Sequence, residues 1–224
     1  MGLNIILFII MMIFDCTYIF TEELLFKTIA STMFVSLGLI NFIQCFKNKK
    51  DLEFPIWMLT ALIYAMVGDV LLGLHFSIGV IVFGIAHIFY IISYSKLNSF
   101  IPRDFFNAAI ISIIIPLPII FILLDTVYIN ISLVILGCIY VVVLSGMLGK
   151  AISNLVRERN SVNITITIGA LLFFISDMCL ILNMFGGISF CRYICLITYY
   201  LAQFLLSFSL LKFSYVEEIL EKNI

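Results

Sequence analysis

Charge is scarce in this sequence. Only 11% of its 224 residues are Asp, Glu, Lys or Arg and 64% are hydrophobic, whereas an ordinary soluble domain is about 25% charged. A water-soluble globule is therefore excluded. The 12 Lys and Arg residues nearly balance the 13 Asp and Glu residues, so no basic tail or stripe is present to bind nucleic acid. We expect a protein of the lipid bilayer.

Several recognisable motifs are also missing. The sequence contains no HExxH, GxSxG, GxxxxGK or GxGxxG pattern and no CxxC pair. Its two histidines, His75 and His87, are a poor ligand set for a catalytic metal, so we expect neither a metal nor a cofactor. The six cysteines resemble small packing side chains, although Cys191 and Cys195, four residues apart, could meet on one helical face.

The apolar runs predict an all-α polytopic membrane bundle. Each run is long enough for the roughly 20 residues of a spanning helix and too long for the strands of an outer-membrane barrel. We expect one domain, residues 1–224, ending in a short tail at 212–224, with a kink in the fifth span at Pro116 and Pro118. The eight predicted spans are 3–20, 25–46, 55–74, 77–96, 105–124, 127–149, 162–184 and 189–211.

The cations predict the orientation. Ten of the twelve follow even-numbered spans, and cytoplasmic loops carry the excess of Lys and Arg. Both termini are therefore predicted to be cytoplasmic. The ten are Lys47, Lys49, Lys50, Lys96, Arg103, Lys150, Arg157, Arg159, Lys212 and Lys222.

Ionisable side chains inside the spans are few, and each costs roughly 2.5–3.5 kcal/mol to insert, which makes it a candidate for function. The set is Asp15, Lys27, Asp69, His87 and Asp177. Asp69 and Asp177 each lie among small residues that let a neighbouring helix approach. These small residues are Ala61, Ala65 and Gly73 around Asp69, and Gly169 and Ser176 around Asp177, whose stripe continues to Asn183.

Asp69 and Asp177 are predicted to lie at one depth. Both come late in outward-running spans, about 7–10 Å below the non-cytoplasmic surface, and Lys27 belongs to the same layer. Two buried acids close together cannot both ionise cheaply, so they should share a proton and supply one acid and one base. The alternative is that the aspartates only join helices and that Lys27 extends to the surface.

Two further stripes accompany the aspartates. His87 and Tyr90 lie one turn apart in the fourth span, and Tyr199 and Gln203 lie one turn apart in the eighth. Ordinary core or interface positions would explain them equally well. Each aspartate-bearing span is followed by a span with Tyr at its middle, which is consistent with two four-helix halves related by an axis along the membrane normal.

These residues resemble those of the lysoplasmalogenase family of integral membrane proteins, also called the YhhN-like family. The resemblance covers roughly residues 25–210, and its motifs come in the family's order. One departure is Lys27-Thr28, where family members often have Lys-Pro. The motifs are the segment from Tyr64 to Leu74 with Gly68 and Asp69, then Gly84, His87 and Tyr90, then Gly169, Ala170, Ser176, Asp177 and Asn183, and finally the run from Thr198 to Gln203.

The resemblance implies a hydrolase that cleaves the vinyl ether bond of lysoplasmalogens to a fatty aldehyde and a glycerophospho-alcohol. Vinyl ethers resist base but hydrolyse once a proton reaches the β-carbon, which requires an acid and a group that activates water. Asp69 and Asp177 suit these roles, and the sequence does not say which is which. The residues expected to orient substrate or water are Lys27, His87, Tyr90, Ser176, Asn183, Tyr199 and Gln203.

Two other classes of function fit the same residues. A small solute or ion-coupled transporter would use a buried Asp, Lys and His relay, although these residues cluster in one half of the bilayer. A lipid-binding scaffold would use the aspartates only to hold helices together. The expected partners are therefore the bilayer and, under the hydrolase hypothesis, a lysophospholipid substrate.

Overall fold

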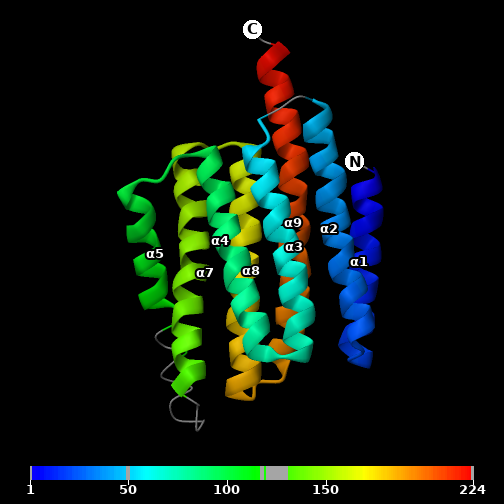
Figure 1. The fold of residues 1–224 in the computed structure, drawn as a ribbon, viewed down its shortest axis with the longest axis vertical. Coiled ribbons are helices and arrows are strands. Elements are labelled where there is room, and N and C mark those ends of the chain that lie inside the picture. Colours follow the sequence, from blue (N-terminus) through cyan, green and yellow to red (C-terminus); the bar gives the residue numbers. More distant parts are fainter. Residues whose placement is uncertain (1, 49–50, 117–118, 120–130, 223–224) are drawn as a thin grey trace.

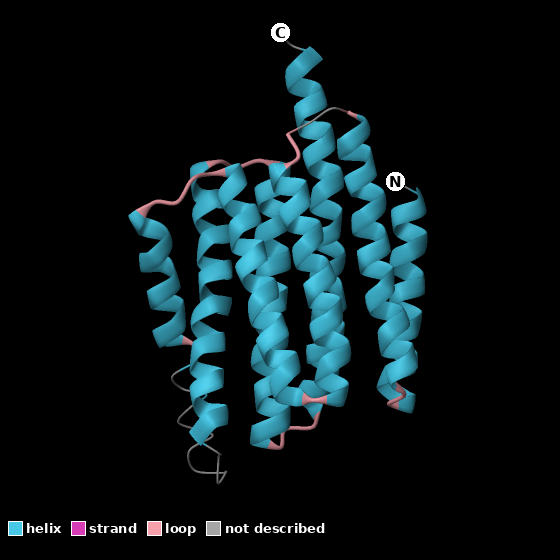
Figure 2. Cartoon of the chain, viewed as in Figure 1, coloured by secondary structure: helices cyan, strands magenta, loops and turns pink. Residues whose placement is uncertain are grey.

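The computed structural model describes residues 2–48, 51–116, 119 and 131–222, which form helices joined by short links (Figure 1). No strand occurs in these segments (Figure 2). The predicted all-α fold is therefore confirmed. The helices are α1 (Gly2–Thr21), α2 (Leu24–Lys47), α3 (Glu53–Leu74), α4 (Phe76–Leu97), α5 (Pro102–Ile114), α7 (Ile131–Arg157), α8 (Ser161–Gly186) and α9 (Phe190–Lys222).

Seven of these helices are long and apolar enough to cross a membrane. Helix α5, described over 13 residues, is the other one. A helix satisfies its own backbone hydrogen bonds, which is the condition for crossing a water-free hydrocarbon layer. The chain is thus an integral multi-pass membrane protein.

The outside of the bundle is apolar and its interior holds polar groups. Large apolar side chains such as Ile9, Ile13 and Ile139 are exposed, whereas Asn41 and Gln203 are completely buried. This arrangement is the reverse of that in a soluble protein and matches a surface in contact with lipid tails. Polar side chains in such an interior need partners, because water is absent there.

Three predicted boundaries differ from the structure. Helix α7 runs to Arg157 instead of ending at 149, because Lys150 is buried in the bundle rather than placed in a loop. Helix α9 continues to Lys222 through most of the predicted tail. Helix α5 ends at Ile114, two residues before Pro116, and Pro118 with most of the rest of that predicted span lies outside the described residues.

Two glycines allow helix backbones to touch. A Cβ atom at Gly79 of α4 would lie 2.5 Å from the backbone nitrogen of Leu72 in α3. One at Gly149 of α7 would lie 2.8 Å from the backbone nitrogen of Ala108 in α5. Small residues at helix crossings are the usual means of tight packing in membranes, and here they join α3 to α4 and α5 to α7.

The helix contacts repeat between the two halves of the chain. In the first half, α1 packs on α2 and α3 on α4; in the second half, α5 packs on α7 and α8 on α9. Across the halves, α2 packs on α9 and α7 packs on α4. Helices α1 and α5 lie at opposite edges of the bundle, and both termini lie at the same end (Figure 1). Among the described helices, this pattern fits two halves of four helices each, related by an axis along the bundle.

We expect Lys150→Met to destabilise the bundle by about 3–5 kcal/mol, the usual loss when one partner of a buried ion pair is removed. Lys150 Nζ lies 2.9 Å from Asp104 Oδ2, and both side chains are almost fully buried. Lys96→Met is the matched control, because Lys96 pairs with Glu53 at 2.8 Å on the surface and should lose at most ~1 kcal/mol. Unfolding in detergent measures both, and equal losses would contradict this role for Lys150.

Candidate active site

A cavity of about 350 Å³ opens between α1, α2, α3, α4, α8 and α9. It lies toward the end of the bundle opposite the termini, since its residues come late in α1, α3 and α8 and early in α2, α4 and α9. Asp69 and Asp177 both line it, as do four other predicted site residues. These four are Lys27, Ser176, Asn183 and Tyr199.

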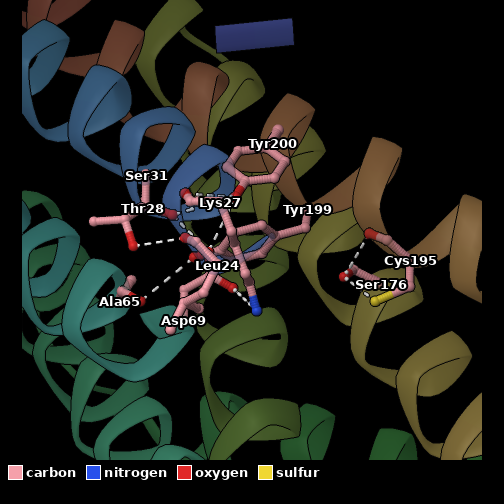
Figure 3. A network of polar contacts seen from close by, with 10 residues as sticks. All are labelled: Leu24, Lys27, Thr28, Ser31, Ala65, Asp69, Ser176, Cys195, Tyr199 and Tyr200. Atoms are coloured by element: carbon pink, nitrogen blue, oxygen red, sulfur yellow. Dashed lines mark hydrogen bonds and ion pairs between the residues drawn. The ribbon is translucent and has the colours of Figure 1, made fainter. Parts of the chain in front are cut away.

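Asp69 is held by an ion pair and two hydroxyl groups. Its Oδ1 lies 2.9 Å from Lys27 Nζ, and the two side chains are 5% and 8% exposed. Its Oδ2 accepts hydrogen bonds from Ser31 Oγ at 2.5 Å and from the Tyr200 hydroxyl at 3.1 Å. Figure 3 shows these groups converging from α2, α3 and α9. The carboxylate thus has one cationic partner and two hydroxyl donors.

The Asp69 centre is fixed further by contacts to the backbone. The Tyr199 hydroxyl donates to the Ala65 carbonyl at 3.4 Å, one turn before Asp69 in α3. Ala65 is completely buried, as predicted for the small-residue face that carries Asp69. Tyr199 and Tyr200 therefore tie α9 to the helices that carry the Asp69 and Lys27 side chains.

Asp177 has a different set of partners. The Tyr140 hydroxyl donates to Asp177 Oδ2 at 2.6 Å, and His87 Nε2 lies 3.4 Å from the same oxygen. His87 Nε2 also lies 2.9 Å from the Tyr140 oxygen. The Tyr140 hydroxyl has one hydrogen, which it donates in the hydrogen bond to Asp177. The Tyr140 oxygen therefore accepts a hydrogen bond from His87 Nε2–H. His87 Nδ1 is buried without a partner among the described residues.

The two centres differ in charge. Among the described residues, Asp177 has no Lys or Arg within ion-pair distance, and its Oδ1 has no hydrogen-bond partner. Asp69, by contrast, has both oxygens engaged and a lysine beside it. The described residues contain no group of three or more His, Cys, Asp or Glu side chains arranged to hold a metal ion. Among the described residues, the site therefore presents one carboxylate paired with a lysine and one carboxyl group without a lysine or arginine partner.

The centres occupy equivalent places in the two halves. Asp69 lies on α3 and Asp177 on α8, and each is bonded by the second helix of its own half, through Lys27 of α2 or Tyr140 of α7. The last helix of the opposite half also contacts each aspartate. Tyr200 of α9 contacts Asp69, and His87 of α4 contacts Asp177. Both centres are thus assembled across the junction between the halves.

The structure does not bring every predicted residue to the cavity wall. His87 is completely buried and reaches the site only through Asp177 and Tyr140. Tyr90 and Gln203 are also buried and bond to each other, from the Tyr90 hydroxyl to Gln203 Oε1 at 2.9 Å. They lie behind the site, where the Tyr90 ring is 6.5 Å from the His87 ring.

Three partners of the aspartates were missing from the sequence-based set. Ser31 lies one turn after Lys27 on the same face of α2, a spacing that would have identified it. Tyr200 directly follows Tyr199, and the sequence does not show which of the two tyrosines contacts Asp69. Tyr140 lies in a continuous apolar run, where a tyrosine carries no signal of its own.

Ser176 Oγ donates to the Cys195 carbonyl at 2.9 Å, which fixes α8 against α9 beside Asp177 (Figure 3). Cys191 and Cys195, the pair that could have met on one face, are both unbridged thiols.

Asp15 is completely buried on α1, and neither of its carboxyl oxygens has a partner among the described residues.

Comparison with known proteins gives one match. The model of the YhhN family matches residues 23–210, which include both aspartates and all the predicted site residues. No curated protein and no solved structure matches the chain. The match confirms the resemblance drawn from the short motifs.

We expect Asp69→Asn to lower the stability of the bundle much more than Asp177→Asn. Removing Asp69 leaves Lys27 buried without its counter-charge, a loss of about 3–5 kcal/mol, whereas Asp177 leaves only neutral partners behind. Restoring the charge balance with the double variant Lys27→Met, Asp69→Asn should recover much of this loss. Thermal unfolding of the three variants in detergent measures the difference. Equal melting temperatures for the two single variants would show that Lys27 does not depend on Asp69.

Proposed function

The chain belongs to the YhhN family, and on this premise we propose that it is an intramembrane hydrolase that cleaves the vinyl ether bond of lysoplasmalogens. The products would be a fatty aldehyde and a glycerophospho-alcohol. The observation that carries the proposal is the single cavity lined by both Asp69 and Asp177 inside an apolar bundle. One substrate molecule in that cavity can contact an acid and a carboxylate together, as acid-catalysed addition of water requires.

The shape of the site supports a lipid substrate. The main cavity, at about 350 Å³, falls within the range of ligand pockets. A second cavity of about 60 Å³ adjoins Asp177 and is lined almost entirely by apolar residues of α3, α4, α7 and α8. A polar head group would occupy the larger cavity and the alkenyl chain would leave past Leu133 and Gly137 of α7, which puts the scissile bond at Asp177.

The partners of the two carboxyl groups suggest their roles. Lys27 pairs with Asp69, whose carboxylate can stabilise a developing positive charge and take up a proton from water. Asp177 has no lysine or arginine beside it, and its Oδ1 is unbonded among the described residues, so we assign it the role of proton donor. Lys27 would thus act on Asp69 rather than on the substrate.

In this scheme Asp177 transfers its proton to the β-carbon of the vinyl ether and leaves an oxocarbenium ion next to the Asp69 carboxylate. Water adds to that cation and its proton goes to Asp69, which gives a hemiacetal. The hemiacetal then collapses: its hydroxyl proton returns to Asp177, and Asp69 protonates the departing glycerol oxygen. One water is consumed, and both groups end in their starting states.

The same proposal includes an orientation. Lys96, Arg103, Arg157 and Arg159 lie in or beside the links at the end of the bundle that carries both termini. With the excess of cations on the cytoplasmic side, that end and both termini face the cytoplasm. The cavity then opens toward the other leaflet.

We expect Asp69→Asn and Asp177→Asn each to reduce aldehyde release from a lysoplasmalogen by about 10²–10⁴-fold, the usual range for loss of an acid–base group. The matched control is Asp15→Asn, because Asp15 is a buried aspartate that does not line the cavity. This control should lose much less activity than either site variant. Purified protein in nanodiscs, with the aldehyde trapped as it forms, provides the measurement.

Two results would contradict the hydrolase. Aldehyde release that survives both substitutions would remove the carboxyl groups from the mechanism. A wild-type protein that releases no aldehyde but takes up a solute with a proton gradient would favour the transporter instead.

The proposed scheme requires Asp177, and not Asp69, to carry the proton before the substrate reacts. The infrared C=O stretch of a neutral carboxyl group should disappear in Asp177→Asn and persist in Asp69→Asn. The measurement belongs in an Asp15→Asn background, because the unpartnered Asp15 carboxyl would add a band of its own. Loss of the band in Asp69→Asn alone would reverse the two roles.

A further inference from the structure

The cavity wall carries a second cation that the mechanism does not use. Among the described residues that line the cavity, the cations are Lys27 and Arg192. Lys27 is bonded to Asp69 at 2.9 Å and is almost fully buried. Arg192 lies at the mouth, in the first turn of α9, with its side chain 29% exposed. Arg192 is therefore the cation available to a ligand that enters the cavity.

The guanidinium of Arg192 is held in place, but most of its N–H donors have no bonded partner in the described part of the chain. Its Nη1 pairs with Glu22 Oε1 in the link between α1 and α2, and it lies over the Tyr18 ring, 5.9 Å from the centroid. A guanidinium has five N–H donors in a planar fork that matches phosphate oxygens. In the described part of the chain only Nη1 has a bonded partner, so the remaining donors are open to a ligand.

The surroundings of Arg192 favour an anion. The first turn of α9 has no acidic residue, and the positive end of a helix dipole attracts negative charge. Glu22, the anion nearest the guanidinium, has a 67% exposed side chain, so solvent weakens its attraction. A phosphate group inside the partly enclosed cavity would interact with the guanidinium more strongly than Glu22 does.

The spacing suits a lysophospholipid. Arg192 precedes Cys195 by about one helical turn, ~5 Å along α9, and the Cys195 carbonyl is bonded by Ser176, the neighbour of Asp177. In a lysoplasmalogen only a glycerol unit separates the phosphate from the vinyl ether oxygen. We propose that Arg192 binds the phosphate of the substrate and thereby places the vinyl ether beside Asp177. This inference rests on the proposed function for the identity of the substrate.

The test compares ligands with and without phosphate. A 1-O-alkyl lysophosphatidylethanolamine has no vinyl ether and is not hydrolysed, and a 1-O-alkylglycerol has neither vinyl ether nor phosphate. We expect Arg192→Gln to weaken binding of the first about tenfold, as for loss of a charge-assisted contact, and to leave binding of the second unchanged. Equilibrium binding in nanodiscs measures both. The KM for a lysoplasmalogen should rise in parallel, with kcat little changed.

Glu22→Gln is the matched control, because it breaks the same ion pair from the other side. Glu22→Gln should bind the phosphate-bearing ligand at least as well as wild type, since the guanidinium loses a competing anion. If Glu22→Gln and Arg192→Gln weaken both ligands equally, the pair is structural and the proposal is wrong. Should Arg192→Gln fail to fold, Arg192→Lys gives the same comparison, because an ammonium cannot form the planar fork.

Two further outcomes separate the hypotheses. Phosphate-dependent binding through Arg192 without any aldehyde release would refute the hydrolase while the phosphate site remains. Inorganic phosphate could stabilise wild type, but not Arg192→Gln, against thermal unfolding. If wild type and Arg192→Gln then bind the lysophospholipid equally, the site takes free phosphate and the proposal is overturned.

Discussion

The cost of placing charge where no water can reach it governs this structure. Asp69 and Lys27 are tolerable inside the bundle because each neutralises the other, and Asp104 and Lys150 do the same toward the other end. Asp177 is accommodated differently, by a hydrogen bond from the Tyr140 hydroxyl and with His87 beside the same oxygen. The two acids on the cavity wall therefore have different electrostatic surroundings.

Repetition of a four-helix unit accounts for the position of the site. Equivalent helices place one aspartate each on the wall of one cavity, and the helices next to them then supply different side chains. Where the first half has Lys27, the second has Tyr140. Similar backbone geometry thus yields two centres with different electrostatics, which is what a reaction that needs a proton donor and an anion requires.

The aspartates could be predicted from the sequence because a carboxyl group within an apolar run is expensive enough to be informative. Their late positions in outward-running spans predicted a common depth, and the structure places both on the wall of one cavity. Tyr140 could not be predicted, because tyrosine costs little in an apolar helix and gives no sign of its partner. The predicted end of the sixth span, at residue 149, was wrong because Lys150 was interpreted as a loop residue. Its partner, Asp104, lies on another helix, and a single sequence gives no information on that pairing. Arg192 and Glu22 are separated by 170 positions, so their proximity also needed the fold.

The exchange of last helices between the halves limits how such a protein can arise. Because α4 serves the aspartate of α8 and α9 serves the aspartate of α3, a solitary four-helix unit would complete neither constellation. An ancestor of that size would have had to associate with a second, parallel copy of itself, and would then have carried two identical clusters. Two separately mutable copies of the unit would be needed before one cluster could carry a lysine and the other a tyrosine.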